Sequence, residues 1–265
     1  MLSIEEIKLL IEKLEKVKKE DLQQLIDSNL KILKDIALAV DANNDQVINR
    51  LDKTPEWYNK DREEKLLKPT VDPITARQVQ SKIFQFAKTN IYNSLEIGPG
   101  NGMFSTDFRA WRLNYFLDIT HGVSKEILKK FNPAHRKYVK FYKTQNTECT
   151  SIPQNSCNFV FSWDTFPFFT QQHVQQYLHD IKRVLIPGGY CFIQYADCHY
   201  DVELDLAKRG YWNYNTKTAM TQIIKDEGYE VVEMNQFRPG ASYAIFRKPG
   251  KQNPVVYKVS ELTLD

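Results

Sequence analysis

The sequence predicts an α/β fold built around a mostly parallel, seven-stranded sheet. From residue 74 onward, short apolar runs alternate with helix-length stretches, which is typical of a parallel sheet covered by helices on both faces. Only a loop with Arg238, Pro239 and Gly240 separates the last two runs, so they are expected to form a hairpin that makes the C-terminal strand antiparallel. The strands are predicted at residues 91–97, 113–118, 138–142, 158–162, 190–195, 229–232 and 242–247, after a helix at 74–88.

Residues 1–73 are predicted to be a separate helical region with a connector. The first 50 residues contain neither Gly nor Pro, and their apolar residues recur at helical spacing. Two interpretations stay open: a coiled-coil arm that forms a homodimer, or a helical cap on the main domain. Trp57 and Tyr58 in the connector are either a lid over a ligand or a packing anchor. The main domain is expected over residues 74–250 and a tail over 251–265.

Composition excludes several classes of protein. Lys and Arg number 36 against 33 Asp and Glu, and this net charge of +3 is too small to indicate nucleic-acid or membrane binding. The basic residues between 125 and 143 are interrupted by Glu126, which favours a solvated face over a nucleic-acid site. No apolar run is long enough to span a bilayer, and the first residues do not resemble a signal peptide. The cysteines show no metal-binding spacing, so we expect reduced thiols, no metal and a cytoplasmic protein: Cys149, Cys157, Cys191 and Cys198.

A glycine-rich turn is the strongest functional signal. It reads Glu96-Ile97-Gly98-Pro99-Gly100-Asn101-Gly102, after an apolar strand and before a predicted helix. Glycines let a backbone turn tightly and approach a ligand closely. A dinucleotide-binding turn needs its third glycine at the place of Met103, so a nicotinamide or flavin site is disfavoured. Asp118 ends the next strand, where a carboxylate is suited to bind a ribose diol.

With Leu185-Ile186-Pro187-Gly188-Gly189 linking a later helix to its strand, these motifs resemble class I S-adenosylmethionine-dependent methyltransferases over residues 74–249. The resemblance implies a Rossmann-like fold and S-adenosyl-L-methionine as cofactor. It implies that residues Glu96 to Gly102, including Pro99, contact the methionine part of the cofactor. Two departures are Thr147 in place of a common Gly and Asn158 in place of a common Asp.

The same resemblance assigns the rest of the cofactor site. It implies that Asp118 holds the ribose, that Ile119 packs on the adenine and that Glu148 binds the adenine amino group. Cys149, which follows Glu148, and Ser162, at the end of the fourth strand, complete the expected cofactor contacts.

Candidate catalytic residues follow the fourth and fifth strands, where doubly wound sheets place their ligands. Asp164 is a candidate general base or metal ligand, or else the cap of a helix that begins near Thr170. Asp197 and His199 are further candidate bases. The segment around Asp164 resembles that of a bacterial group of sugar- and glycan-modifying enzymes, although Phe168 stands where that group has a histidine.

The acceptor is predicted to be a small molecule or a glycan, methylated on a hydroxyl oxygen. The segment from Arg209 to Asn215 is rich in aromatic and amide side chains, which suit sugar rings, unless it packs against the N-terminal helices instead. The alternatives are methylation of a protein or nucleic acid, and a binding module of the same fold without catalytic activity.

Overall fold

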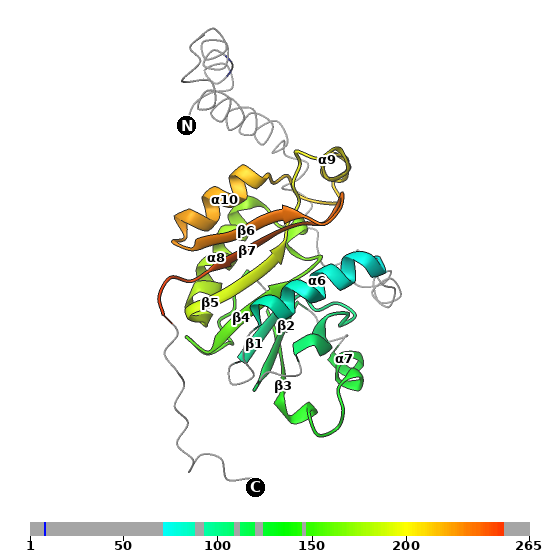
Figure 1. Cartoon of the computed structure of the whole chain (residues 1–265), viewed down its shortest axis with the longest axis vertical. Coiled ribbons are helices and arrows are strands. Elements are labelled where there is room, and N and C mark those ends of the chain that lie inside the picture. Colours follow the sequence, from blue (N-terminus) through cyan, green and yellow to red (C-terminus); the bar gives the residue numbers. More distant parts are fainter. Residues whose placement is uncertain are drawn as a thin grey trace.

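The structure is a computed structural model that describes residues 8, 71–87, 93–108, 112–119, 124–144 and 147–251. These residues form three layers, with a central sheet between two layers of helices (Figure 1). The predicted coiled-coil arm, the Trp57–Tyr58 lid and the C-terminal tail lie outside the described residues, as does the start of the first predicted strand.

The sheet has seven strands in the order β3-β2-β1-β4-β5-β7-β6. The first five strands pair in parallel, and β7 runs antiparallel to both of its neighbours. This confirms the predicted mostly parallel sheet with a reversed C-terminal strand. The strands are β1 (Asn93–Ile97), β2 (Asn114–Asp118), β3 (Val139–Lys143), β4 (Cys157–Ser162), β5 (Leu185–Gln194), β6 (Glu230–Gln236) and β7 (Ser242–Arg247).

Helices cover both faces of this sheet (Figure 1). Their bounds are α6 (Pro73–Phe86), α7 (Ser124–Lys130), α8 (Gln171–Val184), α9 (Asp201–Lys208) and α10 (Lys217–Asp226). On one face, α8 and α10 pack on alternate residues of the central strands, such as Val160 and Ile193. On the other face, α6 packs on the intervening positions, which include Phe161 and Phe192. Because alternate strand residues point to opposite faces, strands that are buried on both sides position their carboxyl ends rigidly.

Two local predictions were wrong. The predicted helix after the glycine-rich turn is a short 3-10 helix, η2 (Ser105–Phe108), in the part of that segment that the structure describes. The chain returns to β2 within a few residues, which leaves little length for a full α-helix. The Pro187–Gly189 segment lies inside β5 and not before it, because Leu185 already pairs with Cys157 and the backbone of Gly188 and Gly189 bonds to Lys248.

Candidate functional site

The glycine-rich turn follows β1 at the carboxyl edge of the sheet. Gly98, Gly100 and Gly102 have φ angles of 64°, 53° and 69°, in the left-handed region that side chains with a Cβ rarely adopt. The Gly98 amide donates to the Leu117 carbonyl at 2.8 Å, so the turn begins while still paired with β2. The backbone conformation therefore favours glycine at all three of these positions.

Residues after β4 close over this turn. Ser162 Oγ donates to the Ile97 carbonyl at 2.8 Å, and Thr165 Oγ1 donates to the Gly98 carbonyl at 3.3 Å. A Cβ on Gly98 would lie 2.1 Å from Thr165 Oγ1, and one on Gly102 would lie 2.8 Å from Ile127 Cγ1. Thr165 and Ile127 thus pack directly against this turn, and a side chain at Gly98 or Gly102 would displace them.

Glu96 lies beneath the turn and is 4% exposed. Ser105 Oγ donates to its Oε2 at 2.6 Å. Burial raises the pKa of Glu96 to about 8; the Ser105 hydrogen bond opposes this shift, and the negative charge of Asp107 adds to it. Lys130 approaches from α7 and donates to the Gly102 carbonyl at 3.1 Å. The site therefore holds a carboxyl group that an additional positive charge would readily ionise.

Asp118 and Ile119 stand at the end of β2, next to the turn. The negative charge of Asp118 is one of the smaller causes that raise the pKa of Glu96, so both carboxyl groups belong to one neighbourhood. Ile119 is 37% exposed, an apolar side chain at the carboxyl edge. The structure thus brings together Glu96, the glycines, Asp118 and Ser162.

The loop that contains Glu148 and Cys149 is held by side chains of α8. Arg183 donates to the Cys149 carbonyl at 2.6 Å and to the Ile152 carbonyl at 3.0 Å, and Asp180 accepts from the Cys149 amide. The Cys149 thiol is buried, which raises its pKa well above the usual value. Cys149 fixes the loop through its backbone, and the side chain of the neighbouring Glu148 is half-buried.

Asp164 does not cap the following helix, so that interpretation was wrong. Thr170 is the N-cap of α8, and its side chain accepts from the His173 amide. Asp164 instead adopts a φ of 56°, which is uncommon for a residue with a side chain and costs about 1–2 kcal/mol. Its amide donates to Gln194 Oε1 at 2.6 Å, so the end of β5 holds this strained residue in place.

Asp197 and His199 form a pair after β5. His199 Nδ1 lies 2.8 Å from Asp197 Oδ1. The same oxygen accepts from the Lys217 amide at 3.0 Å, at the first residue of α10, and Asp197 is only 3% exposed. Because an ionised carboxylate only accepts hydrogen bonds, this geometry places the proton of a neutral His199 on Nδ1 and a lone pair on Nε2.

The amides of the Arg209–Asn215 segment bond to the protein itself. Asn213 Nδ2 donates to the Phe168 carbonyl at 2.6 Å, and Asn215 Nδ2 donates to the Phe169 carbonyl at 3.2 Å. The segment therefore packs on the residues that follow β4, and its predicted N-terminal partner lies outside the described residues. Tyr211 is 64% exposed, so an aromatic side chain of this segment does face outward.

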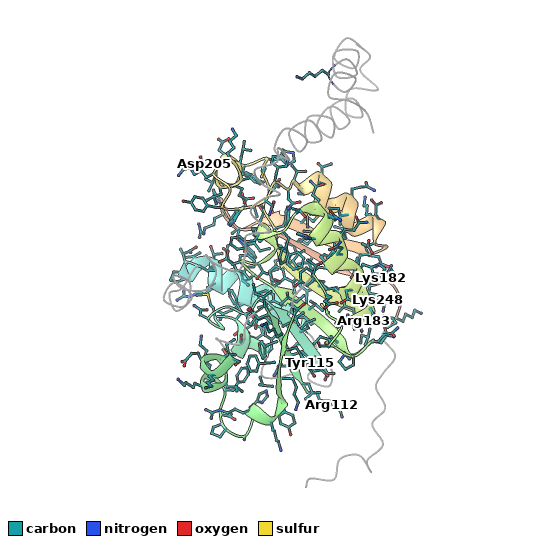
Figure 2. All side chains as sticks on the ribbon, turned by 180° about the vertical axis from the view of Figure 1, so that it is seen from behind. Arg112, Tyr115, Lys182, Arg183, Asp205 and Lys248 are labelled. Carbon is teal, nitrogen blue, oxygen red and sulfur yellow. The ribbon has the colours of Figure 1, made fainter. Side chains whose placement is uncertain are left out.

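Several residues of the site carry no signal that sequence analysis detects. Thr165 meets Gly98 across 67 residues of chain, and Asp180 meets Cys149 across 31. Figure 2 shows Arg183 of α8 and Asp205 of α9 in different parts of the molecule, at the right and at the upper left of the view. Such contacts depend on the three-dimensional fold and leave no local motif.

Comparison with known proteins identifies the domain. Residues 95–193 match the family model described as "Methyltransferase domain". No curated protein matches the sequence.

Solved structures share the fold at low sequence identity. The N-methyltransferase NodS from Bradyrhizobium japonicum, in complex with S-adenosyl-L-homocysteine, aligns with a TM-score of 0.55 and 15% identity, over 71% of this chain and 96% of its own. A putative sarcosine dimethylglycine methyltransferase from Galdieria sulphuraria aligns with a TM-score of 0.53 and 15% identity, over 66% and 86%. A Haloferax volcanii complex of the Trm112 activator with a putative methyltransferase aligns with a TM-score of 0.52 and 11% identity, over 67% and 95%.

The seven-stranded sheet and the match over residues 95–193 are those of a methyltransferase domain. The described residues share this fold with solved S-adenosylmethionine-dependent methyltransferases. Among the described residues, no helix is long and apolar enough to cross a membrane. Over the same ranges, no group of three or more His, Cys, Asp or Glu residues is placed to hold a metal ion.

Proposed function

We propose that the enzyme methylates a hydroxyl oxygen of a small-molecule or sugar acceptor, with His199 as the general base. The Asp197–His199 pair carries this proposal, because a buried carboxylate bonded to Nδ1 orients the imidazole and stabilises its protonated form. A hydroxyl acceptor needs such a base, since its proton must leave as the oxygen attacks. The pair follows β5 on the same edge of the sheet as the cofactor turn.

In this proposal, the cofactor site consists of residues at the carboxyl edge of the sheet. Glu96 and the glycine-rich turn face the methionine part, Asp118 binds the ribose hydroxyls, Ile119 covers the adenine, and Glu148 accepts from the adenine amino group. The left-handed backbone of the glycine-rich turn supports this assignment. When bound, the cofactor would supply a methyl group attached to a positively charged sulfonium sulfur. The rest of the cofactor is then the leaving group, a neutral thioether.

The residues of this chain have three tasks in the transfer. Asp164, held by Gln194, lines the acceptor side and orients the hydroxyl. His199 Nε2 takes the hydroxyl proton as the oxygen–carbon bond forms and the carbon–sulfur bond breaks. Asp197 stabilises the resulting imidazolium.

Replacement of Asp118 by alanine tests the cofactor site. Loss of the ribose hydrogen bonds is expected to weaken S-adenosylmethionine binding by about 1–3 kcal/mol, or roughly 5- to 150-fold. Titration calorimetry measures this, with Asp205→Ala as the control, because Asp205 pairs with Arg209 on the exposed side of α9. Unchanged affinity in Asp118→Ala would remove Asp118 from the site.

Replacement of His199 by glutamine tests the base. Formation of S-adenosyl-L-homocysteine is first followed with sugars and other small hydroxyl compounds, to find an acceptor. His199→Gln is then expected to lower kcat by about 100- to 10,000-fold while cofactor affinity stays the same. His179→Gln serves as the control, since His179 is exposed on α8 and contacts Glu227. Full activity of His199→Gln would exclude this residue as the base. If the enzyme methylates amine acceptors and no hydroxyl compound, the proposed hydroxyl acceptor is excluded.

A further inference from the structure

Glu203 is a buried carboxylate that the proposed mechanism does not use. It lies on α9 and is 0% exposed. Its Oε1 accepts from Ser242 Oγ at 2.8 Å, from Gln236 Nε2 at 3.0 Å and from the Gly240 amide at 3.1 Å. Its Oε2 accepts from the Asp197 amide. Four donors therefore converge on one side chain, which is about the capacity of a carboxylate.

The four donors come from two segments, one distant from Glu203 in sequence and one that lies six residues before it. Three belong to the end of β6, the β6–β7 turn and the start of β7, at separations of 33 to 39 residues from Glu203. The fourth belongs to the loop after β5 that carries the Asp197–His199 pair. Removal of a carboxylate from water costs several kcal/mol unless hydrogen bonds replace its hydration, so Glu203 favours the arrangement in which all four donors point at it.

A continuous series of contacts leads from Glu203 to His199. The Asp197 amide is fixed by Glu203, and the Asp197 carboxylate in turn holds His199 Nδ1 and the first amide of α10, that of Lys217. Rotation of the Asp197 backbone would therefore move the imidazole and the start of α10 together.

A second series leads from Glu203 to Asp164. Gly240, whose amide donates to Glu203, also accepts at its carbonyl from Gln194 Nε2 at 3.0 Å. Gln194 Oε1 accepts from the amide of the strained Asp164. Both candidate acceptor-side residues are thus tied to the same buried carboxylate.

We propose that Glu203 is a positioning residue for the acceptor side of the active site. It sets the orientation of His199 through Asp197, and that of Asp164 through Gly240 and Gln194. The proposal rests on the proposed function in one respect, that His199 and Asp164 serve the acceptor; the orientation of His199 itself is measurable without an acceptor.

The test replaces Glu203 by glutamine in the full chain. Glutamine keeps the side-chain volume, but it replaces one carboxylate oxygen by an NH2 group. This group cannot accept hydrogen bonds from the four donors around Glu203. The readout is the pair of ring ¹⁵N chemical shifts of His199, assigned by comparison with His199→Gln and recorded with neutral imidazole. In the native protein we expect two well-separated shifts, since Nδ1 carries the proton. In Glu203→Gln we expect the two shifts to move toward each other, as the contact with Asp197 loosens and the second tautomer becomes populated.

Glu233→Gln is the matched control. Glu233 is also a partly buried carboxylate with protein partners, Lys82 and Tyr243, but it does not contact the Asp197 loop. Its replacement is expected to leave the His199 shifts unchanged. The proposal is overturned if Glu203→Gln also leaves them unchanged, or if both variants move them equally.

Two further measurements keep the result decisive. If Glu203→Gln does not fold, Gln236→Met removes one donor and leaves the carboxylate intact. A smaller displacement of the His199 shifts in the same direction supports the proposal. Unchanged His199 shifts in this variant contradict the proposal. Calorimetry with S-adenosyl-L-homocysteine separates this proposal from the proposed function. Glu203→Gln is expected to bind it within about twofold of the native protein, whereas full activity in His199→Gln would refute the function and leave the positioning of His199 standing.

Discussion

Replacement of Gly98 by alanine is expected to weaken S-adenosylmethionine binding severely. The added Cβ would lie 2.1 Å from Thr165 Oγ1 and 2.8 Å from its Cγ2, in a residue with a φ of +64°. The left-handed backbone alone costs alanine about 1–2 kcal/mol, and the clash must also displace Thr165 from its hydrogen bond to the Gly98 carbonyl. In the proposed cofactor site, the turn contacts the ligand through its main-chain atoms. Movement of the turn therefore removes several ligand contacts at once. We expect affinity to fall by about 100-fold or more, as measured by titration calorimetry.

Gly228→Ala separates the clash from the backbone strain. Gly228 has a φ of +71°, and the nearest atom to an added Cβ is Lys182 Nζ at 2.8 Å, the far end of a flexible side chain that can move away. This variant is expected to lose stability to a similar degree from strain alone, while it binds the cofactor normally. Equal loss of binding in both variants would mean that global destabilisation, and not the turn, accounts for the Gly98 result.

The sequence predicts the parts of the site that are set by local conformation. Left-handed backbone at Gly98, Gly100 and Gly102 favours glycine, so this preference is visible in the sequence itself. Asp118 is equally visible, since a carboxylate that ends a buried strand stands out against the apolar residues before it. The parallel pairing of the first five strands also follows from the alternation of apolar runs with helix-length stretches.

Contacts between distant residues are not predictable in this way. Glu203 looks like any acidic residue in the first turn of a short surface helix, yet its donors include Gly240 and Ser242, 37 and 39 residues away. Asp164 resembled a helix cap because Asp favours that position, whereas Gln194 instead holds its amide in a left-handed conformation. In both cases the side chain is determined by which segments the sheet places next to it.

Glu96 is expected to make the stability of the cofactor-free protein depend on pH. Its pKa rises from 4.5 to about 8 on folding, chiefly through burial. The folded state therefore prefers the protonated group, so the stabilisation is fully present below the unfolded-state pKa and is lost as pH rises through the folded-state pKa. The free energy of unfolding should fall by at most about 1.4 kcal/mol per pH unit over the range of about pH 5 to 8.

Glu96→Gln isolates this contribution, since the amide keeps the volume of the side chain, accepts from Ser105 and does not titrate. Denaturant unfolding at a series of pH values is expected to give a shallower decline for this variant than for the native protein. Glu126→Gln, on the exposed side of α7, should leave the native slope in place. Identical slopes in native protein and Glu96→Gln would show that Glu96 does not titrate in this range.

The same carboxyl group is expected to couple cofactor binding to proton release. Under the proposed function, the sulfonium and amino groups of S-adenosylmethionine bring positive charge close to Glu96, which lowers the pKa of that carboxyl group and favours its ionised form. Near pH 7, binding should therefore release close to one proton, which calorimetry in two buffers of different ionisation enthalpy measures directly. Glu96→Gln should bind without that release. Proton release of equal size in both proteins would assign it to another group and remove Glu96 from contact with the charged part of the cofactor.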